Sequence, residues 1–474
     1  MNSSISSIFK CLFVFAFCLP SLWMAQISDS SIYYRIGEVQ ISGNRVTKNR
    51  IILRELVKKQ NDTVQLRHLD RVIKRSEYNI FNTQLFIYDS IQPVINDSLK
   101  LIQYRIKLKE RWYIWPIPFV DFLDRNINAW WKEKDMNRLA YGLSLTVENV
   151  TGVKDRLILQ FQSGYAKQFG IHYKLPYLNK QQTLGAYVQG VYNEFKKLSY
   201  TTTDNRQQFA VNKNIKLRTE TGFLTGFTYR PNLFVSHVAE AGYYRISISD
   251  SLAALNPNYF LDNATQLNFA NLMYRFTYDT RDNKVYPLKG TVLDAIFTKN
   301  GLNISEDSPL DITSALFSFK KFIKLHPKFY VATLNKVRLY NTERAIPFAF
   351  NQALGYGNSI RGYEYYVMDG QNFFLTKNSL RFELIKPKFH EVQALRKLKA
   401  FSTVPFYAYL NIYADAGYVK DEYFHRQNPL ANQWQYGYGA GIDFVSYYDF
   451  VLRLEYSINR QQQGGFFVHF VSGF

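Results

Sequence analysis

Alternation of apolar and polar side chains over the C-terminal part of the chain most constrains its fold. In residues 450–459, one face carries Phe450, Leu452, Leu454, Tyr456 and Ile458, and the other carries Val451, Arg453, Glu455, Ser457 and Asn459. Two charges follow one another on the second face, and a lipid-facing Arg at mid-membrane costs about 2–4 kcal/mol. The pattern therefore predicts a barrel with a polar lumen. A soluble sandwich can also alternate, but it would not need so many large aromatic residues.

Alternating segments of this kind extend over residues 138–474. These 337 residues divide into about 16 units of roughly 21 residues, each a transmembrane strand of ~9–11 residues with its connection, and 14 or 18 strands are also compatible. Aromatic residues make up 17% of the chain, which suits the girdles of such a barrel. The mean hydropathy of −0.25 does not argue against a membrane location, because barrel strands average polar and apolar positions.

The N-terminal residues 1–25 have the pattern of a secretory signal. Lys10 supplies the positive charge, Cys11–Leu19 form the apolar region, and Ala25 is a candidate last residue before cleavage. Both cysteines, Cys11 and Cys18, lie inside this segment. The exported chain then has no disulfide, no Cys-ligated metal and no thiol nucleophile.

The chain is strongly basic, with 58 Lys and Arg against 38 Asp and Glu and a formal charge of +20. Behind a secretory signal, lipid head groups and acidic surfaces are better partners for this charge than nucleic acid. Basic residues that merely fill solvated loops are the alternative interpretation.

Residues 32–110 carry a β-α-α-β-β pattern. A first strand ends at Gly43-Asn44, two amphipathic helices follow, and residues 101–109 alternate strictly. This order, with Asn82-Thr-Gln-Leu-Phe86 closing the second helix, resembles a single POTRA domain. Such domains bind clients by adding a strand to a sheet edge. An unrelated small α/β module is the alternative.

Residues 111–137 form an aromatic segment that we expect to link this domain to the barrel. Four of the six Trp lie here, and Pro116 and Pro118 would stiffen the joint. Indole rings prefer the bilayer interface, which places the linker at the membrane surface. A packing cluster between the two domains is the competing explanation.

Two strings, Gly355-Tyr-Gly-Asn-Ser-Ile-Arg-Gly-Tyr-Glu364 and Tyr413-Ala-Asp-Ala-Gly417, occur in this order. Together they resemble the paired signature of the BamA/TamA superfamily. The resemblance implies a loop that carries Ile360, Arg361, Gly362 and Tyr363 into the barrel lumen. Its Arg361 would pair with Asp415 on the wall, with Glu383 as a second possible partner. A guanidinium removed from water needs a carboxylate, so the expected role is structural.

A second string, Tyr278-Asp-Thr-Arg-Asp282 with Pro287 and Gly290, resembles the mid-barrel hairpin of the same superfamily. Its Pro and Gly predict a tight turn between two strands. Asp279, Arg281 and Asp282 are expected to pair with one another near the periplasmic rim. The terminal Phe474 resembles the signal by which outer-membrane barrels are recognised for insertion.

Signatures of an enzyme do not occur in the sequence. The seven His residues are scattered, without an HExxH motif or two His at ligand spacing, and no nucleophile elbow or phosphate-binding loop occurs. We therefore expect no catalytic residue, metal or cofactor.

The resemblance covers essentially the whole mature chain and implies an outer-membrane insertion, assembly or translocation factor with a periplasmic POTRA domain. A client strand would be captured at the POTRA edge and then at the seam where the first strand, near Arg138–Asn149, meets the last, Gly465–Phe474. Expected partners are outer-membrane lipids, unfolded barrel or exported proteins and periplasmic accessory proteins.

Two alternatives stay open. A single POTRA domain is also compatible with a dedicated secretion or lipid-transport pore. A passive diffusion channel belongs to a different class, and the Arg361 loop argues against it because a loop in the lumen narrows the pore.

Overall fold

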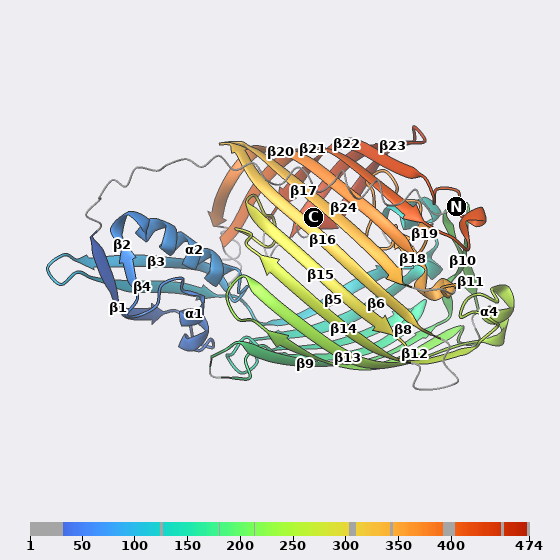
Figure 1. Ribbon diagram of the computed structural model, residues 1–474, viewed down its shortest axis with the longest axis horizontal. Helices are drawn as coiled ribbons and strands as arrows, with labels where there is room; N and C mark the ends of the chain where they lie inside the picture. The colour runs from blue at the N-terminus through green and yellow to red at the C-terminus, as the bar shows by residue number, and fades with distance from the viewer. Residues whose placement is uncertain are drawn as a thin grey trace, which may run out of the picture.

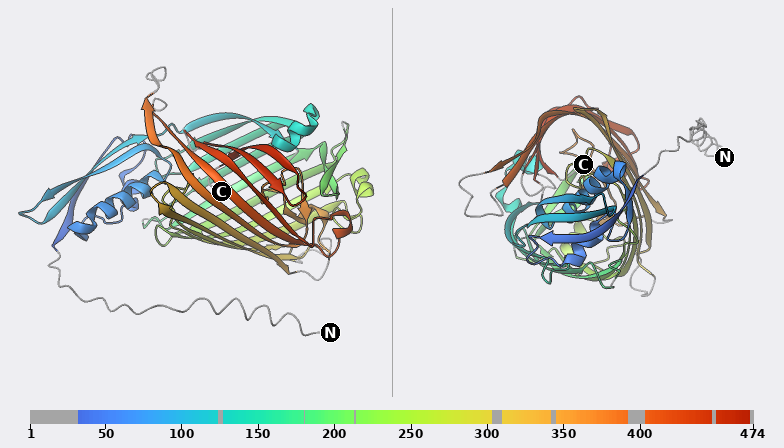
Figure 2. Two further views of the ribbon diagram at one scale, coloured as in Figure 1. Left: turned by 90° about the horizontal axis from the view of Figure 1, so that it is seen from above. Right: turned by 90° about the vertical axis from the view of Figure 1, so that its left-hand side faces the viewer.

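The computed structural model describes residues 32–123, 127–179, 181–212, 214–302, 310–341, 345–391, 403–446 and 450–471. The predicted signal and Phe474 lie outside these ranges. The described chain forms a small α/β domain at one open end of a large β-barrel (Figures 1 and 2). Among the described residues, no helix has the length and apolar character needed to cross a bilayer.

The small domain contains a four-stranded sheet with two helices. Its strands follow the order β2-β1-β4-β3, in which β1 and β4 are parallel and the other pairs are antiparallel. Its core gathers Ile36, Ile51, Ile80 and Phe86, all fully buried. The elements are β1 (Tyr33–Ser42), α1 (Asn49–Glu55), β2 (Thr63–Gln65), a 3-10 turn (Leu66–His68), α2 (Leu69–Phe81), β3 (Phe86–Asn96) and β4 (Leu101–Glu110).

The barrel is one sheet of sixteen strands, in which each described strand is antiparallel to its neighbours. This confirms the predicted fold class and strand number. The strands are β5 (Ile114–Phe122), β6 (Leu139–Glu148), β7 (Arg156–Gly164), β8 (Ala166–Leu175), β9 (Leu184–Phe195), β12 (Arg218–Tyr229), β13 (Val235–Ile248), β14 (Gln266–Asp279), β15 (Gly290–Asn300), β16 (Ile312–His326), β17 (Phe329–Asn341), β20 (Asn372–Glu391), β21 (Thr403–Lys420), β22 (Trp434–Val445), β23 (Val451–Asn459) and β24 (Gly464–Val471).

The connections between barrel strands carry further short elements. They are α3 (Ile127–Glu133), the hairpin of β10 (Lys197–Thr203) and β11 (Arg206–Val211), α4 (Asp250–Leu255), the pair β18 (Gln352–Leu354) and β19 (Met368–Asp369), and 3-10 turns at Met136–Arg138, Phe348–Phe350 and His425–Gln427.

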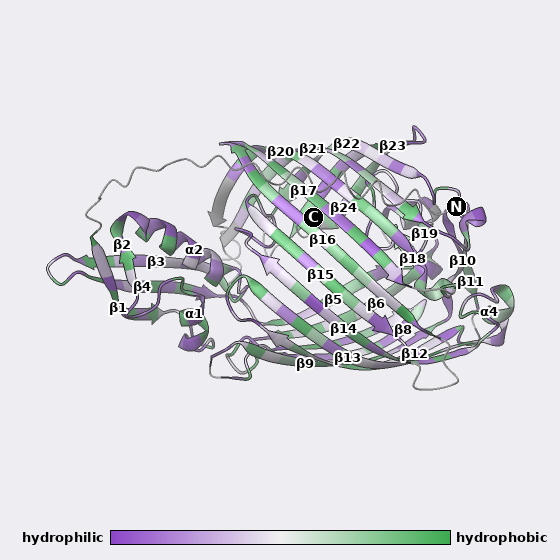
Figure 3. Ribbon diagram, in the orientation of Figure 1, coloured by the Kyte–Doolittle hydropathy of each residue, from purple (hydrophilic) through white to green (hydrophobic). Residues whose placement is uncertain are grey.

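Hydrophilic and hydrophobic residues are interspersed along the barrel strands (Figure 3), and their burial shows which face of the wall each takes. On β23, Arg453, Glu455 and Ser457 are buried in the lumen, whereas Leu454 and Tyr456 are exposed outside. The charged face is therefore the inner one, as the alternation predicts.

The expectation of a linker over residues 111–137 is wrong for Ile114–Phe122. These residues form β5, which pairs along its whole length with β6, so the first barrel strand is β5 and not the segment 138–149. Pro116 and Pro118 were expected to stiffen a linker, but proline is also accepted on an edge strand, and β5 is an edge of the sheet.

Candidate functional site

The connection between β17 and β20 enters the barrel and fills part of its lumen. Its Ile360 and Tyr363 are completely buried among apolar wall residues such as Leu334, Phe373 and Val419. An apolar patch on an otherwise polar inner wall thus receives the loop, and burial of these two side chains favours the inserted position.

Arg361 and Asp415 form a buried two-point ion pair. The guanidinium donates from Nε to Oδ2 at 2.8 Å and from Nη2 to Oδ1 at 2.5 Å, and the Arg361 backbone N–H also donates to Oδ2. The guanidinium carbon lies 3.7 Å from the ring centroid of Tyr413, and Ser379 accepts a further bond. Both charged residues are 3% exposed. The structure therefore brings together the two residues that the resemblance paired.

Glu383 does not take part in this contact. Asp415 lies opposite Lys377 on β20, and Glu383 follows six residues later on the same strand, about 20 Å away at the rise of a β-strand. The alternative pairing of Arg361 with Glu383 is therefore wrong, because the register of β20 places the two side chains at different heights in the barrel.

Glycines let the loop approach the wall. Gly362 adopts φ +91°, a conformation that other residues resist. A Cβ on Gly437 of β22 would lie 1.9 Å from the carbonyl oxygen of Arg361, and one on Gly417 would lie 2.8 Å from the Ile360 side chain. These positions fix the depth of the loop.

The residues after Arg361 reach the last three strands. Tyr363 donates to Gln435 on β22 at 2.9 Å, and Asn459 on β23 donates to the carbonyl of Gly362 at 3.0 Å. Glu364 lies 3.6 Å from His469 on β24. The loop therefore contacts strands β20 to β24.

The second motif forms the turn between β14 and β15. Arg281 binds Asp279 through two bonds of 3.0 and 2.7 Å. Asp282 does not join this pair; its Oδ1 accepts from the backbone N–H groups of Leu288 and Lys289 inside the turn, so the expected three-residue pairing is wrong for Asp282. Gly290 has φ +115°, which a larger residue would resist.

The same turn carries Tyr286 into the lumen, onto a second buried charge cluster. Asp443 receives two bonds from Arg453 and one from the Tyr286 hydroxyl at 2.7 Å. Arg381 lies over the Tyr286 ring and donates to the carbonyl of Pro287 at 3.1 Å. No motif predicts this cluster, because its members are separated by up to 167 positions in the chain.

The small domain contacts this end of the barrel. Asn82, at the end of α2, donates to the carbonyl of Asp282 at 3.4 Å, and Thr47 receives a 2.9 Å bond from Asn149 in the β6–β7 turn. Glu55 on α1 lies 3.3 Å from Arg230 after β12. The β14–β15 turn, which carries the hairpin motif, therefore lies at the barrel end next to the small domain.

The sheet order ends at β5 and β24, and no ladder joins these two strands in the described ranges. On β24, Val468 instead exchanges two backbone bonds with the Asn128 side chain of α3, at 3.0 and 3.1 Å. The side-chain amide thus occupies the place of a neighbouring strand.

The prolines of β5 face this seam. The carbonyl of Tyr113 accepts from Glu148, and the N–H of Leu123 donates to Arg138, so odd-numbered residues of β5 bond to β6. Even-numbered residues then direct their backbone groups away from β6. Pro116 and Pro118 therefore remove two N–H donors from the free edge.

Comparison with known families and structures identifies the fold. The profile of the Omp85 superfamily domain matches residues 149–473. BamA from Haemophilus ducreyi lacking POTRA domains 1–3 is similar at TM-score 0.51 and 12% identity, over 92% of this chain and 83% of that one. CdiB from Escherichia coli is similar at TM-score 0.54 and 12% identity, over 92% and 75%. No curated protein sequence matches the chain.

Proposed function

The chain belongs to the Omp85 superfamily, and we propose that it inserts client polypeptides into the outer membrane, or exports them across it, through the seam between β5 and β24. It is an outer-membrane β-barrel of the Gram-negative type. In this proposal, residues 32–110 are a periplasmic POTRA domain that delivers clients to the barrel.

The observation that carries the proposal is the weak seam. Pro116 and Pro118 leave β5 without two donors, and Asn128 is the group that bonds the backbone of Val468. An edge strand that is covered by one side chain can exchange that side chain for a client strand, which offers a full row of backbone groups. Displacing Asn128 breaks two hydrogen bonds, each with a net value of about 0.5–1.5 kcal/mol.

The lumen loop supports the proposal by holding one side of the seam. Arg361, Tyr363 and Glu364 contact strands β21, β22 and β24 from inside. The wall from β20 to β24 is thereby stiffened, while on the other side of the seam β5 is bonded to β6 alone among the described strands. Movement at the seam then separates β5 from a fixed β24.

The small domain offers a second docking edge. β3 ends the four-stranded sheet, and its Tyr88 and Ile95 are exposed. An extended client segment can add to this edge and place apolar side chains beside these residues. The contacts of α2 with the β14–β15 turn hold the domain at the barrel opening, so that a client bound here lies close to the lumen.

A photo-crosslinking amino acid at Val468 tests the proposal. In cells that make this variant, we expect covalent adducts with nascent outer-membrane or exported proteins, identified by mass spectrometry. Leu272 is the matched control, since it is also exposed on the outer face but lies in β14, about half-way round the sheet order. Adducts of equal yield at both positions would contradict a seam-specific role.

Depletion of the protein then separates client classes. Loss of particular barrel proteins from the outer membrane supports insertion, and loss of a secreted protein supports export. A change in outer-membrane lipids alone, with an unaltered protein profile, would reject both forms of the proposal in favour of a lipid pore.

A further inference from the structure

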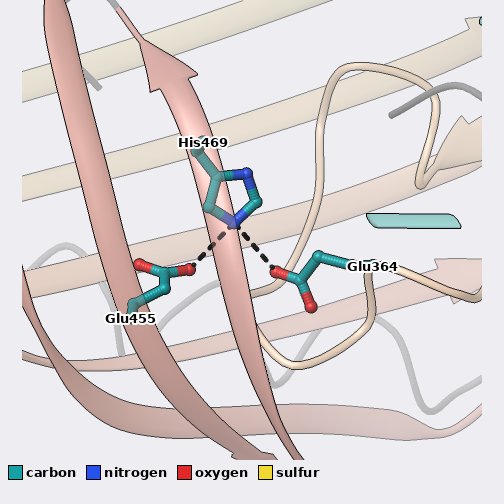
Figure 4. Close-up of side chains that lie close together, drawn as sticks. All are labelled: Glu364, Glu455 and His469. Carbon is teal, nitrogen blue, oxygen red and sulfur yellow. Dashed lines mark ion pairs between the residues drawn. The ribbon is translucent and has the colours of Figure 1, made fainter. Parts of the chain in front are cut away.

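One imidazole and two carboxylates meet inside the barrel, next to the seam (Figure 4). His469 of β24 lies with its Nε2 3.2 Å from Oε1 of Glu455 on β23 and 3.6 Å from Oε1 of Glu364 in the lumen loop. The three ligand atoms all lie within 4.8 Å of one another. Glu364 and Glu455 are 4% and 3% exposed, so both carboxylates are removed from bulk water, whereas the His469 side chain is 23% exposed.

The carboxylate of Glu455 is not fully hydrogen-bonded by the described part of the chain. Its Oε1 contacts the imidazole of His469 at 3.2 Å, and its Oε2 has no hydrogen-bond partner among the described residues, although its side chain is fully buried. A buried carboxylate in this condition costs free energy unless a cation neutralises it. His469 is its ion-pair partner, and Arg453 and Lys377 lie within electrostatic range of it, while its Oε2 keeps lone pairs that no described donor meets.

Glu364 is oriented toward the same point. Its Oε2 accepts the backbone N–H of Gly362 at 3.0 Å, which directs Oε1 to His469. Side chains that bind a metal typically accept or donate a second hydrogen bond of this kind, because it fixes the ligand atom in place.

From this arrangement we infer that Glu364, Glu455 and His469 bind a divalent transition metal, with Zn²⁺ as the best match. Zn²⁺ binds nitrogen and oxygen at about 2.0–2.2 Å in a tetrahedron, which places ligand atoms about 3.3 Å apart. The two His469 distances are close to this value, and the two carboxylate oxygens lie within 4.8 Å of each other. One imidazole with two carboxylates favours Zn²⁺ over Mg²⁺ and Ca²⁺, which prefer oxygen ligands alone.

Bound metal would tie three separate segments together. Glu364 belongs to the loop, Glu455 to β23 and His469 to the edge strand β24. The site goes beyond the proposed function and does not depend on it, since metal binding is measured without any client.

Zn²⁺ titration of the purified full-length chain in detergent, after removal of metal by a chelator, tests the inference. Calorimetry is expected to show one tight site per chain. His469→Ala and Glu455→Gln each remove a metal ligand. Loss of a residue that merely hydrogen-bonds a ligand weakens metal binding about 10- to 100-fold, so each of these variants should weaken Zn²⁺ binding at least as much. Zn²⁺ should also raise the thermal unfolding temperature of the unaltered chain but not that of His469→Ala.

His172→Ala is the matched control. His172 also lies on a barrel strand and is partly buried, but its ring packs edge-on against Tyr187, and its strand β8 is separated from β24 by β5, β6 and β7. This variant should bind Zn²⁺ as tightly as the unaltered chain.

Three results would overturn the inference: no Zn²⁺ binding by the unaltered chain, equal binding by His469→Ala, or equal competition by Mg²⁺ or Ca²⁺. Heat-modifiable migration in gels checks that each variant forms a barrel. If His469→Ala fails this check, the nearly isosteric Glu455→Gln decides the question by the same titration.

Discussion

At the scale of single residues, the Arg361–Asp415 pair is expected to stabilise the barrel. Replacing Arg361 with Ala leaves Asp415 buried without its guanidinium, which should cost about 3–5 kcal/mol of unfolding free energy. Denaturant unfolding in micelles, followed by heat-modifiable migration, measures this loss. The double variant Arg361→Ala with Asp415→Ala should lose less than the sum of the single variants.

Lys299→Ala is the matched control for this pair. Lys299 and Asp311 form an ion pair with side chains 33% and 46% exposed, and such a pair contributes about 0–1 kcal/mol. An Arg361→Ala barrel no less stable than the Lys299→Ala barrel would show that the buried pair is not structural.

Contacts between residues could be predicted from the sequence where both residues belong to a recognisable motif. They could not be predicted where only the fold brings the two residues together. Arg361 and Asp415 lie in recognisable strings and meet in the structure. The pairing of Arg361 with Glu383 was predicted wrongly, because only the register between β20 and β21 shows how far along the barrel axis Glu383 lies from Asp415. His469, Tyr286 and Asn128 were missed because each contacts a residue at least 105 positions away in the chain, and no local pattern reports such a contact.

At the scale of elements, the prolines of β5 should limit its pairing with β24. Replacing Pro116 and Pro118 with Val restores two N–H donors on the seam edge. We expect a barrel that is more stable by about 1–3 kcal/mol, from two hydrogen bonds, and that processes clients more slowly. Slowed amide exchange at positions 116 and 118 would report the new pairing directly.

Pro176→Val, in the turn after β8, controls for the loss of proline itself. Fast amide exchange at 116 and 118 together with unchanged client handling would contradict the assigned role of these prolines.

Asp89 on β3 should make the small domain sensitive to pH. Burial, and then the neighbouring charge of Glu77, raise the pKa of Asp89 from about 3.8 to about 7. Because the folded state holds this proton more tightly, its stabilising contribution is complete below pH 4 and is lost as the pH rises through 7. Asp89→Asn should therefore unfold at a higher urea concentration than the unaltered chain at pH 8 and show a weaker pH dependence.

The helical circular dichroism signal follows this unfolding, since α2 in the small domain is the longest helix described. Glu38→Gln removes an exposed carboxylate of the same domain and serves as the control. Equal urea midpoints of Asp89→Asn and the unaltered chain at pH 8 would refute this role of Asp89.

Element prediction worked best where a pattern repeats. Alternation over many strands gave the barrel and its sixteen strands, because each strand has one apolar and one polar face. It failed for β5, where the Trp residues and the two prolines indicated a stiff linker at the membrane surface. An edge strand needs hydrogen bonds on one side only, so its sequence departs from the pattern of inner strands.

At the scale of the whole molecule, the inserted loop should keep the barrel from acting as an open pore. Planar-bilayer recordings of the unaltered chain are expected to give small, fluctuating conductance. Replacing residues 345–371 with a short Gly-Ser linker should raise it, because the loop and its apolar cluster occupy the lumen. A large, stable, ohmic conductance of the unaltered chain would support the passive channel instead.

The arrangement of the two domains could not be predicted from sequence. Contacts such as Thr47 with Asn149 and Glu55 with Arg230 join residues about 100 to 175 positions apart. Each residue alone has the pattern of an ordinary surface position, so only the folded molecule shows that the small domain is held against the barrel opening.

A reversible lock across the seam shows whether the barrel must open between β5 and β24 to handle a client. Cysteines at Asn128 and Val468, in a chain whose own cysteines lie within residues 1–25, can be joined by a short reducible thiol crosslinker. The same lock at Tyr274 and Phe297, which are paired on β14 and β15, is the control. We predict that the seam lock stops client insertion or export and that a reductant restores it, while the control lock has no effect. Unchanged client handling by the seam-locked barrel would show that clients do not pass through the seam between β5 and β24.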